Sequence, residues 1–135
     1  MSVPHVLFVC VKNGGKSQMA AGLMRHRAGT SVGVDSAGTK PGTAINALSA
    51  QSLSEIGVDI GTQAPKAITA EMMAAADRVV VLGREARIEA SDDARIDYWD
   101  TDEPSERGIE GLERMRLVRD DIAARVDALV LDLHV

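Results

Sequence analysis

The chain has 135 residues, with 15 Lys and Arg residues against 20 Asp and Glu residues, a formal net charge of −5 and one cysteine, Cys10. This length predicts a single domain over residues 1–135, large enough to build a hydrophobic core without disulfide or metal staples. One cysteine cannot form an internal disulfide or supply a multi-thiolate zinc site, and it suits a reducing compartment. We therefore expect a cytoplasmic protein that holds no metal.

The apolar segments and the net charge exclude two further classes of protein. The longest apolar runs, residues 6–11 and 79–82, are far shorter than the roughly 20 residues of a membrane-spanning helix. No basic segment with a cleavage site precedes them, as a signal peptide would require. A negative net charge repels nucleic acid phosphates on average. The sequence thus predicts no membrane and no nucleic acid partner, and any anion must be captured by a local site.

Strand-like apolar runs alternate with helical patterns along the chain, which is typical of βαβ units. We expect strands, in chain order, over residues 5–9, 32–36, 79–82 and 95–98. We expect helices over residues 17–26 and 44–56, a short helix capped by Thr69, a short helical stretch after Gly83, and a final helix whose apolar stripe runs from Leu112 to Leu133. An acidic loop, residues 99–106, precedes the final helix. The pattern predicts an α/β fold of three layers, α/β/α, around a central parallel sheet of about four strands.

The loop after the first expected strand carries the strongest functional signal. It begins at Cys10 and continues through the candidate oxyanion-binding residues Val11, Lys12, Asn13, Gly14, Gly15, Lys16 and Ser17. Ligands of open α/β sheets bind at the carboxyl ends of the strands, where this loop lies. The two glycines allow a sharp turn that aims N–H groups inward, and the next helix adds its positive end. The same groups and Lys16 favour a thiolate, so we expect Cys10 to be a nucleophile.

Two other interpretations of this loop are open from the residues alone. A lone cysteine at the end of an apolar strand is often an inert buried side chain. Gly15-Lys16-Ser17 also matches the end of the nucleotide-binding motif G-x-x-x-x-G-K-[ST], whose Lys and Ser would contact phosphate and magnesium. The first glycine of that motif falls on Cys10, however, and no clear acidic magnesium ligand follows Leu82. A nucleotide site is therefore the weaker alternative.

The loop consists of a cysteine, five further residues, a cation and a serine. This pattern resembles the C-x5-R-S phosphate loop of the low-molecular-weight tyrosine phosphatases and of the arsenate reductases that share their fold. The resemblance covers nearly the whole chain, and it is carried by Asn13, Ser17-Gln18-Met19-Ala20, Ser36-Ala37-Gly38, Tyr98-Trp99, Asp102-Glu103-Pro104 and residues 117–122. The S-Q-M-A segment is similar to the arsenate reductases, because the phosphatases more often have proline after the serine. The resemblance implies a low-molecular-weight phosphatase-like fold.

Two residues depart from the pattern of these families. Lys16 stands where the families have arginine, so a point charge replaces the planar fork that grips two oxygens at once. Glu103 stands before Pro104 where aspartate is usual, and we take Glu103 as the general acid, with Asp102 as its alternative. A solvated turn is the plain interpretation of this acidic segment. Lys66 is a possible supporting cation of the cradle, although a solvated lysine is the commoner case.

The resemblance also implies how a reaction would finish. Thioredoxin-coupled arsenate reductases of this fold carry two more cysteines after the third strand, where this chain has Gly83 and no sulfur up to Asp92. A chain with one thiol cannot form an internal disulfide, so it cannot complete a reaction that oxidises its thiol. The chain resembles the actinobacterial branch that transfers arsenate to mycothiol, with no bound cofactor, mycothiol as co-substrate and mycoredoxin acting downstream. We expect arsenate detoxification by such a transferase, acting as a monomer or weak homodimer; the alternatives are a tyrosine phosphatase and a non-catalytic oxyanion-binding module.

Overall fold

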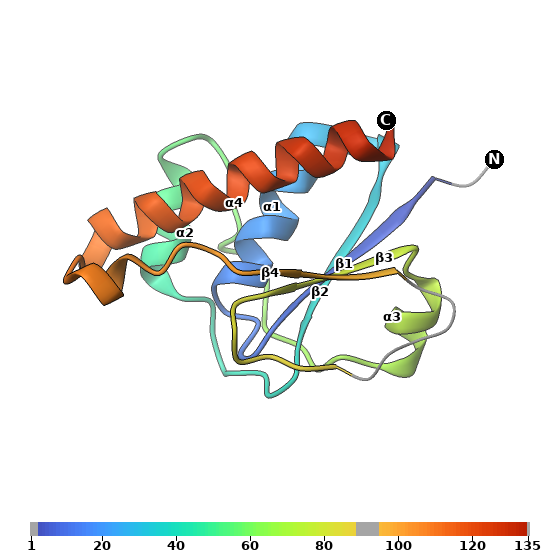
Figure 1. The fold of residues 1–135 in the computed structure, drawn as a ribbon, viewed down its shortest axis with the longest axis horizontal. Helices are drawn as coiled ribbons and strands as arrows, with labels where there is room; N and C mark the ends of the chain where they lie inside the picture. The colour runs from blue at the N-terminus through green and yellow to red at the C-terminus, as the bar shows by residue number, and fades with distance from the viewer. Residues whose placement is uncertain (1–2, 89–94, 135) are drawn as a thin grey trace.

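A computed structural model describes residues 3–88 and 95–134 of the chain. Four parallel strands form one sheet in the order β2-β1-β3-β4 (Figure 1). The strands are β1 (His5–Cys10), β2 (Gly33–Gly38), β3 (Arg78–Leu82) and β4 (Arg95–Trp99). Both central strands, β1 and β3, are continuous apolar runs, as expected for strands that are covered on both faces. The expected parallel sheet of about four strands is confirmed.

Helices cover both faces of the sheet. They are α1 (Lys16–Ala28), α2 (Ala47–Ser54), α3 (Ala70–Ala75) and α4 (Gly111–Leu133), with 3-10 turns at Gly29–Ser31 and Pro104–Arg107. One face of the sheet, with Phe8 and Val80, packs into a core with α1, α2 and α4. The opposite face, with Val9 and Val81, packs against α3, which lies below the sheet in Figure 1. The expected three-layer arrangement is therefore confirmed. Among the described residues, no helix has the length and apolarity to cross a bilayer.

The element boundaries agree with the sequence except at two places. The second helix begins at Ala47 rather than at residue 44, because Asn46 caps it by accepting a hydrogen bond from the Ser49 N–H at 2.9 Å. Thr69 caps α3 as expected. The expected helical stretch after Gly83 is wrong over residues 84–88, which run without helical structure and bury Ala86 against the lower face of the sheet. The rest of that stretch lies outside the described residues.

An ion-pair cluster joins the end of α2 to α4. It predicts that the protein loses stability at acidic pH. Arg116 holds the Glu55 carboxylate through two nitrogens, at 2.9 and 2.6 Å, and Arg119 adds a contact at 3.0 Å. The hydrogen bonds from Arg116 lower the pKa of Glu55 from its ordinary value of 4.5. Because the pKa is lower in the folded protein, the stabilisation is complete above about pH 4.5 and is lost as the pH falls through the folded-state value.

We therefore expect the melting temperature to fall with pH below about 4.5, and we expect a Glu55→Gln protein to show a shallower fall, because it lacks this group. Thermal unfolding followed by circular dichroism between pH 3 and pH 7 measures both curves. Glu71→Gln is the matched control, since Glu71 makes no ion pair with any described residue. Identical pH dependence in the wild type and Glu55→Gln would contradict this assignment.

Candidate functional site

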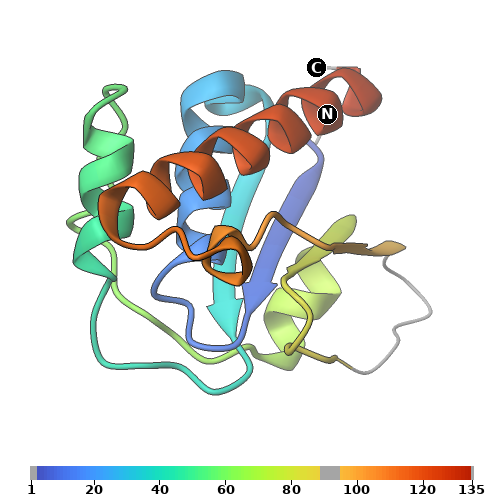
Figure 2. The ribbon, with the colours of Figure 1, turned by 60° about the vertical axis from the view of Figure 1, so that its left-hand side comes forward.

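Cys10 is the last residue of β1 and lies at the carboxyl edge of the sheet, between the two neighbouring strands β2 and β3. Cys10 is only 8% exposed, so the surrounding chain covers almost all of it. The loop from Val11 to Gly15 follows, and α1 starts at Lys16 without a side-chain cap at its first turn. Figure 2 shows this loop at the arrowheads of β1 and β2. The sequence prediction placed the loop at this edge, and the structure agrees.

The backbone of the loop is oriented by the segment after β2. Four loop carbonyls accept hydrogen bonds from that segment: Cys10 O from Thr39 N, Val11 O from Lys40 N, Lys12 O from Gly42 N, and Gly14 O from Asn46 N, at 2.7–3.1 Å. In a planar trans peptide the N–H points opposite to the carbonyl. The next N–H groups of the loop therefore face away from the outer segment, and one of them, the Asn13 N–H, donates to Cys10 Sγ at 3.3 Å. Such a loop can hold an oxyanion with main-chain donors.

The sharp turn of the loop is made by Asn13. Its φ is +52°, the left-handed region, whereas neither Gly14 nor Gly15 has a positive φ. Asparagine tolerates this conformation better than most side chains. Gly14 serves instead as a point of close approach, because a Cβ there would lie 2.9 Å from Ala44 O. The expectation that the two glycines make the turn is therefore only partly right.

Gly38 at the end of β2 is the second point of close approach. A Cβ at this position would lie 2.6 Å from Val11 O and 3.1 Å from Asn13 N, so the loop must move to accept one. We expect Gly38→Ala to destabilise the protein by about 1–3 kcal/mol and to slow alkylation of Cys10. Gly42→Ala is the control, because its Cβ would meet Lys12 Cβ at an ordinary 3.7 Å. Chemical unfolding and thiol kinetics report both effects, and equal behaviour of the two variants would contradict the prediction.

A buried polar network surrounds the thiol. Ser17 Oγ lies 2.9 Å from Cys10 Sγ, and Asn13 Nδ2 donates to Ser17 Oγ at 2.7 Å. Both Asn13 and Ser17 are fully buried. The sulfur thus receives the Asn13 main-chain N–H at 3.3 Å and faces the Ser17 hydroxyl. The structure thus places the sequence-predicted residues Cys10, Asn13 and Ser17 in one contiguous cluster.

Lys16 and Glu103 form an ion pair across the mouth of the loop. Lys16 Nζ donates to Glu103 Oε1, and the two side chains are 23% and 25% exposed. Gly83, directly after β3, adjoins this lysine, since a Cβ there would be in ordinary contact with Lys16 Nζ, at 3.6 Å. The pair brings the expected anion-binding cation and the expected general acid together from 87 residues apart in the chain. An oxyanion in the loop would compete with Glu103 for the same ammonium group.

Asp102, the alternative acid, is held differently. Arg107 donates to both of its carboxylate oxygens, at 2.7 and 3.1 Å, and these hydrogen bonds lower the pKa of Asp102. A carboxyl with a lowered pKa stays ionised and is a poor proton donor. The Asp102 main-chain N–H donates to Asp121 of α4 at 2.8 Å, which anchors the acidic segment. The geometry therefore favours Glu103 over Asp102 as the acid.

Lys66 contacts the loop through its main chain. Its N–H donates to Asn13 Oδ1 at 3.0 Å, and its carbonyl accepts from Gly38 N at 2.8 Å. The ammonium group instead pairs with Asp35 at 2.5 Å, with both side chains more than 40% exposed. The side-chain role suggested by the sequence stays a prediction, whereas the main-chain role is visible in the structure.

Three residues that contribute to the site were not identified from the sequence. Gln18, Gly38 and Asp121 each lie in a segment that carries the family resemblance, but each also contacts a residue in another element or loop: Ala64, Val11 and Asp102, respectively. The only signal in the sequence was their membership of S-Q-M-A, S-A-G and residues 117–122. A motif shows that a residue belongs to a pattern and does not show which atom it contacts.

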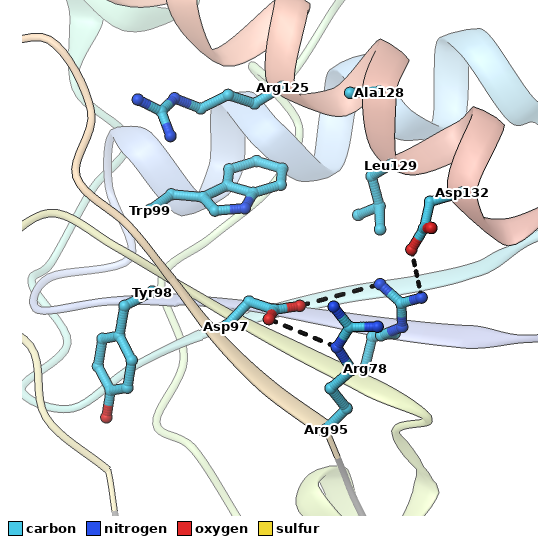
Figure 3. A pocket seen from close by; sticks show the side chains of 9 residues that line it. All are labelled: Arg78, Arg95, Asp97, Tyr98, Trp99, Arg125, Ala128, Leu129 and Asp132. Atoms are coloured by element: carbon cyan, nitrogen blue, oxygen red, sulfur yellow. Dashed lines mark hydrogen bonds and ion pairs between the residues drawn. The ribbon is translucent and has the colours of Figure 1, made fainter.

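Two surface hollows among the described residues adjoin β4. A hollow of about 470 Å³, lined by Gly83, Arg84, Arg87, Tyr98 and Asp100, adjoins Lys16 at the carboxyl edge. A hollow of about 370 Å³ between β4 and α4 is drawn in Figure 3. Its charges are already paired, with Arg78 bonded to Asp132 at 2.5 Å and close to Asp97 at 3.8 Å. Of these two hollows, only the one lined by Gly83 lies next to Lys16, at the end of the Cys10 loop.

Comparisons with known proteins agree with this geometry. The family model described as low molecular weight phosphotyrosine protein phosphatase matches residues 5–134. An arsenate reductase of Halalkalibacterium halodurans is 32% identical over 135 residues, covering 93% of this chain and 94% of that protein.

Two solved structures share the fold. A thioredoxin-dependent arsenate reductase of Corynebacterium glutamicum superposes with a TM-score of 0.83 at 33% identity; the match covers 98% of this chain, which spans 62% of the length of that structure. An Erwinia amylovora tyrosine phosphatase, 18% identical, has a TM-score of 0.81 over 97% of this chain and 93% of its own. With its four-stranded parallel sheet and its thiol loop between β1 and α1, the chain belongs to the low molecular weight phosphotyrosine protein phosphatase family.

Proposed function

We propose that this protein is an arsenate reductase that captures arsenate on Cys10 and passes it to an external thiol, mycothiol. The observation that carries the proposal is the position of Cys10 Sγ, which receives the Asn13 N–H and faces Ser17 Oγ inside a loop of inward-pointing N–H groups. The relatives that match along nearly their whole length are named arsenate reductases, which supports arsenate as the oxyanion.

The first step joins sulfur to arsenic. The Cys10 thiolate attacks arsenate, an As–S bond forms and an As–OH bond breaks, and the hydroxyl leaves as water with a proton from Glu103. The loop N–H groups and Lys16 bind the remaining oxygens. The bound oxyanion competes with Glu103 for the Lys16 ammonium, which frees the Glu103 carboxyl to face the leaving oxygen.

The second step regenerates the enzyme. The mycothiol thiolate attacks the arsenic of the adduct, a new As–S bond forms, and Cys10 leaves as thiolate. Arsenic keeps its oxidation state in both steps. Reduction follows away from this chain, when a mycoredoxin thiol attacks the mycothiol sulfur, forms a mixed disulfide and leaves two electrons on arsenic as arsenite.

The need for an external thiol is inferred from the number of cysteines in the chain. The chain has one cysteine, so no second sulfur can resolve the Cys10 adduct within the molecule. The Corynebacterium glutamicum relative is named thioredoxin-dependent, and thioredoxin is therefore the comparison that any test must include. A small thiol can reach a cysteine that is only 8% exposed more easily than a protein can.

The test compares reductants. Purified protein is incubated with arsenate and one of three systems: mycothiol with mycoredoxin, glutathione with glutaredoxin, or thioredoxin with its reductase. Consumption of NADPH measures turnover. We expect turnover in the mycothiol system only. Turnover in the thioredoxin system alone would replace the proposed thiol and leave arsenate reduction standing.

Two outcomes would overturn the function itself. Fast hydrolysis of an aryl phosphate, without arsenate turnover under any thiol, would identify a phosphatase. Tight binding of arsenate or phosphate with no chemistry under any thiol would identify an oxyanion-binding module. Because Lys16 supplies one ammonium group rather than the two-pronged grip of arginine, we expect only slow phosphate ester hydrolysis.

A further inference from the structure

Gln18 lies beneath the Cys10 loop, in the first turn of α1. Its side chain is 1% exposed. The Nε2 amide lies within hydrogen-bond distance of three acceptors: Asn13 O at 3.2 Å, Asn13 Oδ1 at 3.1 Å and Ala64 O at 3.3 Å. Its carbonyl oxygen, Oε1, is buried and has no partner among the described residues. The side chain thus serves as a donor only.

The donors around Asn13 determine which way its amide faces. Oδ1 receives the Gln18 Nε2 group and the Lys66 main-chain N–H at 3.0 Å. An amide whose oxygen is held by two donors must turn its nitrogen to the other side, where Asn13 Nδ2 donates to Ser17 Oγ at 2.7 Å. If the amide were flipped, the two donors would face an NH2 group and the bonds would be lost.

The orientation of Asn13 in turn directs the Ser17 hydroxyl. An oxygen that accepts from Asn13 Nδ2 keeps its own hydrogen for another acceptor. The acceptor within reach is Cys10 Sγ, at 2.9 Å. A hydroxyl that donates to sulfur stabilises the thiolate, whereas a hydroxyl that accepts from it stabilises the thiol.

We propose that Gln18 is a positioning residue for the nucleophile: by orienting the Asn13 amide it makes Ser17 a donor to Cys10 Sγ. Gln18 touches neither substrate nor sulfur and acts through two intervening side chains. The inference rests on the proposed use of Cys10 as a nucleophile, and it does not depend on arsenate or on any particular thiol.

The partnerless Oε1 supports a functional reason for glutamine at this position. A buried carbonyl without a donor is unfavourable, and an apolar side chain of equal length would avoid it. The amide group of Gln18 is therefore explained by the hydrogen bonds that its nitrogen, Nε2, donates. A long apolar residue would fill the same space and lose the control of Asn13.

Other charged groups near the thiol do not account for the same effect. Lys16 of α1 faces the loop mouth and pairs with Glu103 of the acidic segment. The Lys66 ammonium, in the segment under the loop, is paired with Asp35 of β2. A substitution at Gln18 leaves these four groups in place, so a change in thiolate fraction would come from the hydrogen-bond chain.

The test follows the alkylation of Cys10 by iodoacetamide from pH 5 to pH 10, which is a clean probe because the chain has one cysteine. We expect Gln18→Met to lower the rate at neutral pH by roughly threefold to tenfold and to move the rate profile toward higher pH. The effect is limited because Lys66 N still holds Asn13 Oδ1. Gln51→Met, on the exposed side of α2, is the control and should match the wild type.

A second pair of variants tests the route through Ser17. In a Ser17→Ala background, Gln18→Met should cause no further change, because the hydroxyl that Gln18 directs is gone. If the two substitutions multiply instead, or if the Gln18→Met profile coincides with that of the wild type, the proposal is wrong. A lower melting temperature with an unmoved profile would show a purely structural role. If Gln18→Met does not fold, Gln18→Leu replaces it in the same comparison.

Failure here is separable from failure of the proposed function. Alkylation requires neither arsenate nor mycothiol, so a normal Gln18→Met profile would leave arsenate turnover untouched. Conversely, a protein without arsenate turnover could still show the shifted profile.

Discussion

A Cys10→Ser protein is expected to lose thiol-dependent arsenate turnover by at least about a thousandfold, because a hydroxyl at this pH is a far weaker nucleophile than a thiolate. Arsenate binding should persist, since the N–H groups of the loop belong to the main chain and remain in place. NADPH consumption measures the first effect, and isothermal calorimetry with arsenate measures the second.

The double measurement separates a damaged loop from a missing nucleophile. If both turnover and binding disappear, the serine has disturbed the loop, and Cys10→Ala provides the second variant. If turnover in Cys10→Ser stays near the wild-type rate, Cys10 is not the nucleophile and the proposed reaction is wrong. If the wild-type protein itself binds arsenate but shows no turnover with any thiol, and Cys10→Ser binds equally well, the oxyanion-binding module is favoured.

Glu103→Gln is expected to lower kcat for arsenate turnover by about 10²–10⁴-fold, the range that a general acid contributes. The structure places Glu103 on Lys16 at the mouth of the loop, where the leaving oxygen would receive a proton. The neighbouring residue supplies a matched control of the same chemistry. Asp102→Asn should leave kcat within about threefold of the wild type, because Arg107 lowers the pKa of Asp102 and keeps it ionised.

The two variants also differ in their pH dependence. A general acid must be protonated, so wild-type kcat should fall on the alkaline side as the acid ionises, and Glu103→Gln should lose that limb. Asp102→Asn keeps the main-chain bond to Asp121, so the acidic segment stays anchored. A larger loss in Asp102→Asn than in Glu103→Gln would exchange the two assignments. Measurement of kcat against pH with saturating arsenate decides between them.

The ion pair of Lys16 and Glu103 also affects how KM and kcat should change in Glu103→Gln. Glu103→Gln removes a competitor for the Lys16 ammonium, so KM for arsenate should fall while kcat falls more. A loss of kcat accompanied by a rise in KM would indicate that Glu103 chiefly positions Lys16.

Much of the fold could be predicted from local pattern. The continuous β-branched runs of β1 and β3 could only be strands buried on both faces, and the apolar stripe of α4 could only face a core. The helix predicted after Gly83 failed because burial of Ala86 against the sheet outweighed a weak local preference. The start of α2 moved because Asn46 both caps the helix and bonds to the Cys10 loop.

By itself, the sequence determined the loop between β1 and α1 and the single thiol at its first position, and from these it predicted an anion site and a second thiol from outside. These follow from residue type and spacing over a few residues. Only the tertiary structure decided that Asn13 makes the turn, that Lys16 meets Glu103 from 87 positions away, and that Gln18 orients the network. The contact of Lys16 with Glu103 depends on which chain segments meet at one sheet edge, about which local periodicity holds no information. Gln18 lies only five residues from Asn13, but the loop conformation that brings them together is held by hydrogen bonds to later segments of the chain.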